Sequence, residues 1–295
     1  MKGYAWANGA ATILNAVANW KGSAFGIKLQ TRAEVELDRT GRVRGDVPGV
    51  DTRLIETCVR MVLERLGYSY GATVRTFSEI PVAGGLKSSS TAANAAVLAT
   101  LDALQEDLDL AEAAKIGVAA AREVGVTITG ALDDALASML GGVVVTDNRQ
   151  MTLLRREEFS CSVMLLIPDK KLFSGDTNIA RSRLIAPVAD VVFDLAMRGD
   201  YERAMTVNGL AYCAALGLSA EPMLLALQAG AKGASLSGTG PSYSAIIDEN
   251  RMDALEAAWR PLGGRVIRTK ANNRCASKGR ESNGATRASQ RDRED

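Results

Sequence analysis

A run of small and polar residues from Pro81 to Ala96, PVAGGLKSSSTAANAA, gathers groups that could bind an anion. Gly84 and Gly85 would let the backbone turn its amide groups inward, and the hydroxyls of Ser88–Thr91 stand where a helix begins. Lys87 adds a positive charge at the same point. Unsatisfied N–H groups at a helix start attract phosphate. The run therefore predicts a phosphate-binding loop, and a serine-capped helix after a glycine turn is the alternative.

A second glycine-rich loop, SLSGTGPSYSA, covers Ser235–Ala245 and separates two expected strands. Its backbone amides could also turn inward, and Pro241 would make the exit of the loop rigid. The residues that would line this second site are Ser237, Gly238, Thr239 and Gly240. The same pattern is also typical of an ordinary hairpin.

Two adjacent acids, Asp133 and Asp134, stand at the start of a short apolar helix in TGALDDALASMLGG, Thr129–Gly142. The chain has no histidine, so acid–base chemistry must fall to Asp, Glu, Lys or Tyr, and a bound metal is expected to be a hard cation on oxygen ligands. Neighbouring residues on a helix point in different directions, so we expect at most one of the two acids to face a substrate. The alternative is that both only complement the helix dipole.

The elements that must position these groups mix strands and helices without strict alternation, which indicates an α+β fold. Alternating or continuous apolar runs predict strands, and apolar residues at helical spacing predict helices. Asp51 and Asp109 are expected to cap two of the helices, and Gly67 to end the first. Strands are expected at 31–38, 72–81, 141–147, 161–168, 233–248 (around a loop) and 264–269, and helices at 51–67, 110–123, 131–140, 177–229 (broken near Gly199 and Gly217) and 253–262.

The chain has 295 residues, which is enough for two domains. We expect an N-terminal domain at 1–156, a C-terminal domain at 157–272 and a disordered tail at 273–295, whose composition offers nothing to bury. A net charge of +1 gives no general attraction to nucleic acid or to an acidic membrane, and no apolar run is long enough to span one. Four cysteines without metal-binding spacing favour reduced thiols and a cytoplasmic location.

These elements, in this order, resemble the GHMP family of small-molecule kinases, named for galacto-, homoserine, mevalonate and phosphomevalonate kinases. The central motif of the family, Pro-x-x-x-Gly-Leu-x-Ser-Ser, is met by Pro81, Gly85, Leu86, Ser88 and Ser89. The third motif, Ser-Gly-x-Gly-Pro, is met by Ser237, Gly238, Gly240 and Pro241. Within the family the closest likeness, over about residues 1–272, is to the archaeal-type shikimate kinases. It is carried by NGAATILNAVANWKGSAFGI, PVAGGLKSSSTAANAA, TGALDDALASMLGG and FSGDTNIARSR.

The resemblance implies a two-domain kinase that uses ATP and Mg²⁺, with ferredoxin-like character in its C-terminal half. Asp134 matches the family's catalytic aspartate, seven residues before Gly141. Glu123 matches a magnesium-binding glutamate, and the second protein ligand of the magnesium ion would be Ser89 or, alternatively, Ser88 or Ser90. Mevalonate kinases carry a lysine in their first motif that partners the catalytic aspartate, and NGAATIL lacks it. Either another cation, for which Lys87 is the candidate, helps stabilise the transferring charge, or the aspartate works without such a partner. The ATP phosphates are expected at Pro81, Val82, Ala83, Gly84, Gly85, Leu86, Lys87, Ser88, Ser89, Ser90 and Thr91.

The resemblance also implies the acceptor, the 3-hydroxyl of shikimate, in a step toward chorismate and the aromatic amino acids. The acceptor's carboxylate needs a cation, for which Arg181 or Arg183 is our choice, with a solvated loop as the alternative for each. Lys170 and Lys171 are further candidates, and Thr12 and Asn15 could meet the hydroxyls. Other hypotheses are a homoserine kinase, an ATP-dependent decarboxylase or a non-catalytic nucleotide-binding module. The sequence leaves the oligomeric state open.

Overall fold

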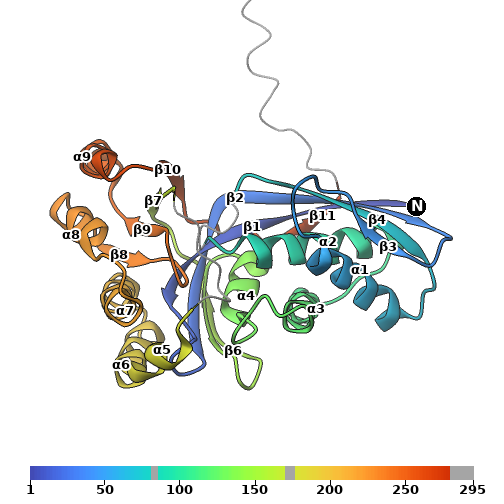
Figure 1. Ribbon diagram of the computed structural model, residues 1–295, viewed down its shortest axis with the longest axis horizontal. Helices are drawn as coiled ribbons and strands as arrows, with labels where there is room; N and C mark the ends of the chain where they lie inside the picture. Colours follow the sequence, from blue (N-terminus) through green and yellow to red (C-terminus); the bar gives the residue numbers. More distant parts are fainter. Residues whose placement is uncertain (81–85, 170–176, 280–295) are drawn as a thin grey trace, which may run out of the picture.

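The computed structural model describes residues 1–80, 86–169 and 177–279. Over these ranges the chain forms two β-sheets with helices packed on them (Figure 1). The larger sheet and its helices come mainly from the N-terminal half, and the smaller sheet with its helices comes from the C-terminal half. The predicted α+β class is confirmed.

The larger sheet is organised around β1 and β2, two long antiparallel strands. The first part of β2 pairs with β5 and the last part pairs with β4, so the two ends of β2 belong to different parts of the sheet. In the described part of the chain the sheet has seven strands: β1 (Lys2–Leu14), β2 (Lys21–Asp38), β3 (Val43–Gly45), β4 (Gly71–Ser78), β5 (Val143–Asp147), β6 (Thr152–Glu157) and β11 (Ser277–Lys278).

Helices α1 (Arg53–Leu66), α2 (Ser88–Leu104) and α4 (Leu132–Leu140) pack on one face of this sheet, and α3 (Leu110–Glu123) packs against these helices. Helix α2 lies directly on β1 because the residues in contact are small. A Cβ atom at Gly3 would stand 2.1 Å from the backbone oxygen of Ala99, which no real side chain tolerates. At the other end of α2, Thr91 Oγ1 donates to the backbone oxygen of Asn8 at 3.1 Å. These contacts fix the beginning of α2 over the middle of β1.

The smaller sheet has the strand order β10-β7-β9-β8, all antiparallel, and the chain runs through it as strand, helices, two strands, helix and strand. This is the ferredoxin-like arrangement expected for the C-terminal half. Its strands are β7 (Ser162–Ile167), β8 (Gly233–Leu236), β9 (Tyr243–Ile246) and β10 (Arg265–Lys270). Its helices are α5 (Ile179–Leu184), α6 (Ala186–Met197), α7 (Tyr201–Leu216), α8 (Glu221–Gln228) and α9 (Met252–Trp259), with short 3₁₀ turns at Glu249–Arg251 and Arg260–Leu262.

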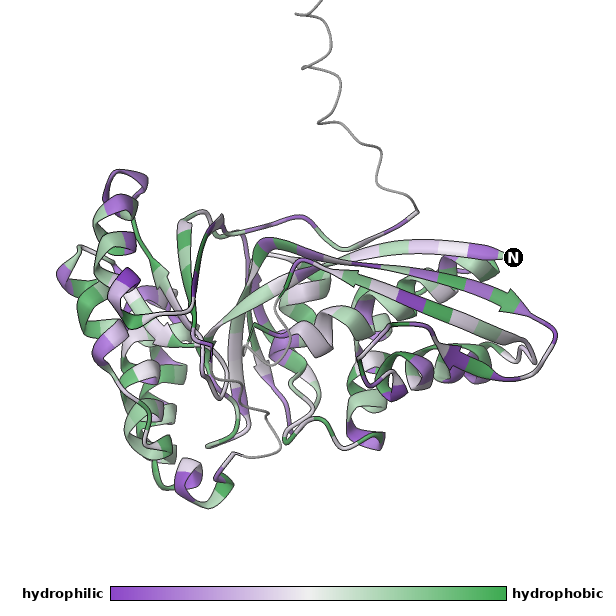
Figure 2. Cartoon of the chain, turned by 45° about the horizontal axis from the view of Figure 1, so that its top comes forward, coloured by the Kyte–Doolittle hydropathy of each residue, from purple (hydrophilic) through white to green (hydrophobic). Residues whose placement is uncertain are grey.

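Buried apolar residues form two clusters, and β1 and β2 contribute to both. Ala5, Ala7 and Ala10 pack into the cluster under α1–α4, whereas Ile13 and Leu14 pack with the smaller sheet and α7. Figure 2 shows hydrophilic and hydrophobic residues alternating along the long strands, on the right of the view. Because both cores share β1 and β2, the end of β1 is held between the two halves of the molecule.

Some local expectations need correction. Helix α1 begins after Thr52 rather than at Asp51, whose carboxylate instead accepts a hydrogen bond from the backbone N–H of Arg53 at 3.1 Å. The predicted C-terminal end at Gly67, in the left-handed conformation, is confirmed. Residues 273–279 were expected to be disordered, but β11 pairs with β1 and Ala276 donates its N–H to the backbone oxygen of Met139 at 2.7 Å. Those bonds are to distant segments, which the local composition does not reveal.

The division into domains stays a prediction, because a boundary between folding units is not the same as a change of sheet. The chain passes from the larger sheet to the smaller one between Glu157 and Ser162. Residues 280–295 lie outside the described residues.

Candidate active site

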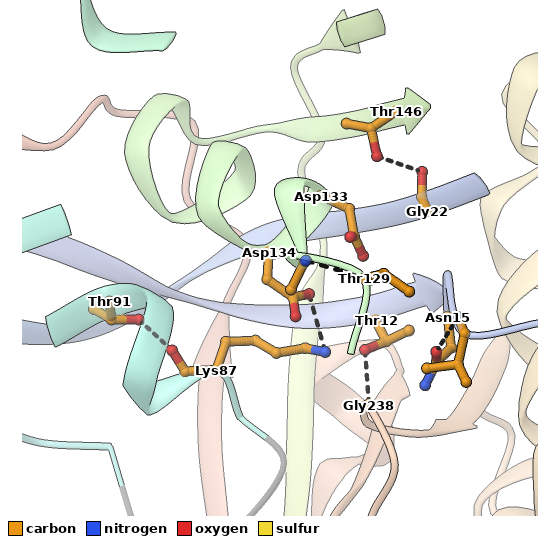
Figure 3. A network of polar contacts seen from close by, with 12 residues as sticks. Thr12, Asn15, Gly22, Lys87, Thr91, Thr129, Asp133, Asp134, Thr146 and Gly238 are labelled. Atoms are coloured by element: carbon orange, nitrogen blue, oxygen red, sulfur yellow. Dashed lines mark hydrogen bonds and ion pairs between the residues drawn. The ribbon is translucent and has the colours of Figure 1, made fainter. Parts of the chain in front are cut away.

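A cavity of about 60 Å³ lies where the two halves of the molecule meet. Its walls come from the segment after β1, the starts of α2 and α4, the segment before α4 and the loop between β8 and β9 (Figure 3). The residues that line it are Asn15, Ala16, Val17, Lys87, Thr127, Ile128, Thr129, Ala131, Asp133, Asp134, Gly238 and Thr239. The cavity therefore brings together elements of all three motifs that the sequence singles out.

The start of α2 presents Lys87 to this cavity. Lys87 is the N-cap residue and has a left-handed backbone, with φ of 65°, and no side chain caps the first turn. Its neighbour Leu86 is buried, and the backbone N–H of Thr91 donates to the backbone oxygen of Lys87 at 3.0 Å. The backbone is therefore held on both sides of the lysine in a conformation that costs free energy outside glycine.

The start of α4 is fixed by the segment before it. Ala131, the N-cap residue, and Gly130 both have positive φ angles, of 49° and 88°. Arg122, on α3, donates a hydrogen bond from Nη2 to the backbone oxygen of Thr129 at 2.9 Å. Asn94 of α2 donates to the backbone oxygen of Ala135 at 2.8 Å, which ties the two helix starts together.

Lys87 and Asp134 form an ion pair inside the cavity. Lys87 Nζ lies 2.9 Å from Asp134 Oδ1, and about a tenth of each side chain is exposed (Figure 3). The ammonium holds this oxygen, and a carboxylate has further lone pairs, so Asp134, which lines the cavity, can also accept a hydrogen bond from a hydroxyl group that enters it.

Asp133 occupies a different environment from its neighbour. It is 3% exposed, and its Oδ1 accepts a hydrogen bond from Asn148 Nδ2 at 2.8 Å. Thr146 Oγ1 orients that amide through a bond of 2.7 Å to Asn148 Oδ1. Burial, and next the negative charge of Asp134, raise the pKa of Asp133 to about 7, against the opposing effects of Lys87 and Asn148. Gly22 packs on this carboxyl so closely that a Cβ there would stand 2.5 Å from Asp133 Cγ.

Both acids line the cavity, but Asp133 is held by Asn148 and Asp134 pairs with Lys87, so the expectation that at most one of them faces a substrate stays a prediction. They occupy the second and third positions of α4, whose end projects into the cavity, so side chains about 100° apart on the helix can reach its wall. The sequence predicts the pair but not their different partners.

The second glycine loop meets the end of β1. Gly238, with φ of 60°, donates its backbone N–H to Thr12 Oγ1 at 2.8 Å, and Gly238 and Thr239 line the cavity. Ser237 is fully buried, and Gly240 has φ of 85°. Thr12 is also fully buried and holds this loop, whereas Asn15 lies on the cavity wall.

Several predicted site residues stand elsewhere. Glu123, the last residue of α3, is half exposed, and its Oε1 lies 2.5 Å from Arg60 Nη2 in an ion pair. Arg181 and Arg183 are exposed on α5, and Arg181 Nη2 donates to the backbone oxygen of Ala214 at 3.2 Å. Among the described residues, no three or more His, Cys, Asp or Glu side chains gather as a metal site. The roles assigned to these residues stay predictions.

The remaining candidates lie at the first turn of α2 or outside the described residues. Ser88 and Ser90 are partly buried, Ser89 is exposed and Thr91 is buried. Outside the described residues lie Pro81, Val82, Ala83, Gly84, Gly85, Lys170 and Lys171.

Sequence reasoning missed the residues that support the cavity from behind. Asn148 and Arg122 fix Asp133 and the segment before α4, and Asn208 and Tyr212 of α7 bind the segment after β1. One signal was present: Asn148 directly follows the buried strand Val143–Asp147, where polar side chains often serve a site. The α7 residues give no such signal, since they look like ordinary positions of a buried helix.

Comparison with known proteins decides the family. Residues 53–142 match the N-terminal domain of GHMP kinases. Over 279 residues the chain is 60% identical to the shikimate kinase of Methanothrix thermoacetophila, an alignment that covers 95% of this chain and 97% of that protein. The chain belongs to the GHMP kinase family. This kinase is also 47% identical to the shikimate kinase of Halobacterium salinarum over 275 residues, which cover 91% of this chain and 96% of its relative.

Solved structures of GHMP kinases share the fold. The mevalonate kinase of Methanococcus jannaschii superposes with a TM-score of 0.74 at 15% identity, covering 92% of this kinase and 98% of that chain. The homoserine kinase of Cytophaga hutchinsonii gives a TM-score of 0.74 at 16% identity, covering 94% and 97%. The expected family and fold are confirmed, and the chain is an ATP-dependent small-molecule kinase. None of the helices in the described ranges is both long enough and apolar enough to cross a membrane.

Proposed function

We propose that this kinase transfers the γ-phosphoryl group of ATP to the 3-hydroxyl of shikimate, giving 3-phosphoshikimate and ADP. The relatives that match it over almost their whole length are named shikimate kinases. The observation that carries the chemistry is the pair of Lys87 and Asp134 on the wall of the cavity, where the Asp134 carboxylate can also accept a hydrogen bond. A carboxylate in this position can hold the acceptor hydroxyl and receive its proton as transfer proceeds.

The start of α2 supplies the complementary half of the reaction. Its first N–H groups have no side-chain cap, and Lys87 and the hydroxyls of Ser88–Ser90 stand beside them. An ATP phosphate chain at this helix start would receive these donors. Because the transition state of phosphoryl transfer is loose, positioning and charge stabilisation supply most of the rate. Lys87 can offer its charge to the transferring group while its ion pair orients Asp134.

Magnesium fits this donor set through oxygen ligands. Mg²⁺ is usually bound by the substrate phosphates, water and one or two protein oxygens, so a single serine hydroxyl at the first turn of α2 is sufficient. We propose Ser89, with Ser88 and Ser90 as neighbours, and Glu123 only if its carboxylate leaves Arg60. The ion would neutralise charge between the phosphates.

The acceptor would lie against Asp134 and Asn15, on the side of the cavity that faces away from α2 (Figure 3). Its carboxylate needs a cation, and we keep Arg181 or Arg183 as the proposal, since both are exposed on α5. We also propose a cytoplasmic location, which suits the four free thiols and an ATP-dependent reaction.

A panel of acceptors tests the proposal. ATP, Mg²⁺ and the purified kinase are combined with shikimate, other polyol acids, homoserine or mevalonate, and ADP formation is measured. We expect turnover with shikimate and a product whose phosphorus NMR couples to the proton at carbon 3. Turnover with homoserine or mevalonate but not with shikimate would refute the acceptor while leaving the kinase chemistry in place.

A further inference from the structure

We propose that Asn208 and Tyr212, on α7, are positioning residues that hold the acceptor side of the site in place. Neither residue lines the cavity; both bind the segment Asn15–Ala18, which does. The inference rests on the proposed function, because it concerns the side of the site where the acceptor would bind.

The contacts between α7 and this segment are unusually complete. Asn208 Oδ1 accepts the backbone N–H of Asn15 at 3.0 Å, and the hydroxyl of Tyr212 donates to the backbone oxygen of Asn15 at 2.9 Å. The same hydroxyl accepts the backbone N–H of Ala18 at 2.9 Å. Asn208 and Tyr212 are four residues apart, so they share one face of α7, and each is 1% exposed.

These side chains take the place of a strand partner. The segment follows β1 and precedes β2, so Asn15 and Ala18 lie outside the hydrogen-bond ladder between the two strands. Backbone groups buried without partners cost free energy, so a short buried connection must be bound by something else. Burial raises the pKa of the Tyr212 hydroxyl, so it stays protonated and keeps donating to Asn15.

Asn208 also reaches the second wall of the cavity. Its Nδ2 donates at 3.2 Å to Oγ of Ser235, which lies in β8 at the start of the second glycine-rich loop. Helix α7 and β8 touch at Gly209, where a Cβ would stand 2.7 Å from the Cα of Ser235. On the opposite side, Gly238 is bound to Thr12 of β1. One helix of the C-terminal half thus sets the distance between the Asn15 wall and the Gly238 wall.

The arrangement of the cavity assigns these walls to the acceptor. In Figure 3, Lys87 reaches Asp134 from the start of α2, while Asn15 and Gly238 lie beyond the tip of the lysine. The ATP phosphates would lie at α2, so the acceptor hydroxyl must approach Asp134 from the side of Asn15 and Gly238. A shift of the Asn15 segment should therefore weaken the binding of the acceptor and leave the binding of ATP nearly unchanged.

Tyr212→Phe in the full chain tests this, because it removes only the hydroxyl and leaves the ring in place. Loss of its two hydrogen bonds to the Asn15–Ala18 segment predicts a rise of about five- to tenfold in the KM for shikimate. The KM for ATP should stay within about twofold. Asn208→Ala should also raise the KM for shikimate, and it provides a second measurement if Tyr212→Phe folds poorly.

The matched control is Tyr201→Phe, at the other end of α7. Tyr201 is 2% exposed, and its hydroxyl donates to Glu157, which keeps its ion pair with Arg155. If the loss of a buried hydroxyl acts only through stability, both variants should lower the unfolding midpoint alike and neither should separate the two KM values. Equal changes in both KM values of Tyr212→Phe, or no change in either, would overturn the inference.

The test is separable from that of the proposed function. Turnover of shikimate by the unmodified kinase is measured first and decides the acceptor. Whichever acceptor of the panel is turned over then serves for the KM comparison, so the positioning role is judged even if shikimate is the wrong substrate.

Discussion

Helix α3 begins differently from α2 and α4. At the start of α3, the exposed Asp109 accepts the backbone N–H groups of Ala111 and Glu112 at 2.9 and 3.1 Å, as the sequence predicts. At α2 and α4 the N-cap residues are Lys87 and Ala131, and no side chain caps either start. Among the described helices, only these two begin from a residue in the left-handed conformation.

The difference follows from what each helix start does. A capped start satisfies its own N–H groups and has little left to offer a ligand. The starts of α2 and α4 face one cavity, carry side chains of opposite charge and keep a strained backbone, which other packing must hold in place. We infer that these two helix starts serve binding and catalysis, and that they contribute less to stability than a capped start does. Changes at α2 and α4 should then act on activity, and changes at α3 on stability.

The largest effect is expected from Asp134→Asn, which keeps the size of the side chain but removes the charge that pairs with Lys87. General acid–base groups contribute about 10²–10⁴-fold, so kcat should fall by roughly a thousandfold. ATP affinity, measured by calorimetry, should change by less than about threefold. Asp109→Asn is the control, since asparagine also caps helices and Asp109 is remote from the cavity. Unchanged turnover of Asp134→Asn would show that Asp134 is not the catalytic base.

The next largest effect is expected from Lys87→Ala. The loss of a charge beside the phosphates is expected to weaken ATP binding by about 10- to 100-fold, and shikimate binding by much less. Gln105→Ala is a matched control, because Gln105 stands at the other end of α2, also in the left-handed conformation, with φ of 59°. Equal losses for both ligands in Lys87→Ala would place the lysine away from the phosphates.

How well the sequence predicts a feature depends on how far apart in the chain the interacting residues lie. The capped start of α3, the left-handed Gly67 after α1 and the glycine loop between β8 and β9 depend on neighbouring residues, so local patterns suffice. Asp134 and Lys87 were likewise singled out from their motifs, and their roles stay predictions. Their contact at 2.9 Å was not predicted, because the motifs suggest Lys87 only as a cation for the transferring charge.

What could not be predicted depends on distant segments. The inner part of β1 is buried throughout, so it lacks the alternation that marks a half-buried strand. Arg60, far from Glu123 in sequence, pairs with it on an exposed face, and nothing local to Glu123 indicates that. The partners of residues 273–279 are β1 and α4, which the composition of the C-terminal segment cannot reveal.

The buried acid of α4 predicts a pH effect on stability. The pKa of Asp133, raised to about 7, lies above that of a carboxyl in the unfolded chain, so the folded state keeps a proton that the unfolded state has released. This contribution is fully present below pH 4 and is lost as the pH rises to about 7. Asp133→Asn is neutral at every pH, so its unfolding midpoint should fall by several degrees less than that of the wild type between pH 5 and 8. Parallel curves would show that Asp133 is ionised in the folded protein throughout.

The smallest effect is expected at the capped start of α3, where a substitution should change stability and not activity. Asp109→Ala removes the acceptor of two backbone N–H groups and should lower the free energy of unfolding by about 1 kcal/mol. Denaturant unfolding measures this change, and Asp109→Ser, which can still cap, should recover most of it. Because Asp109 does not line the cavity, kcat and both KM values should remain those of the wild type. If activity fell with stability, α3 would be coupled to the site through Arg122, and the division between the two kinds of helix start would fail.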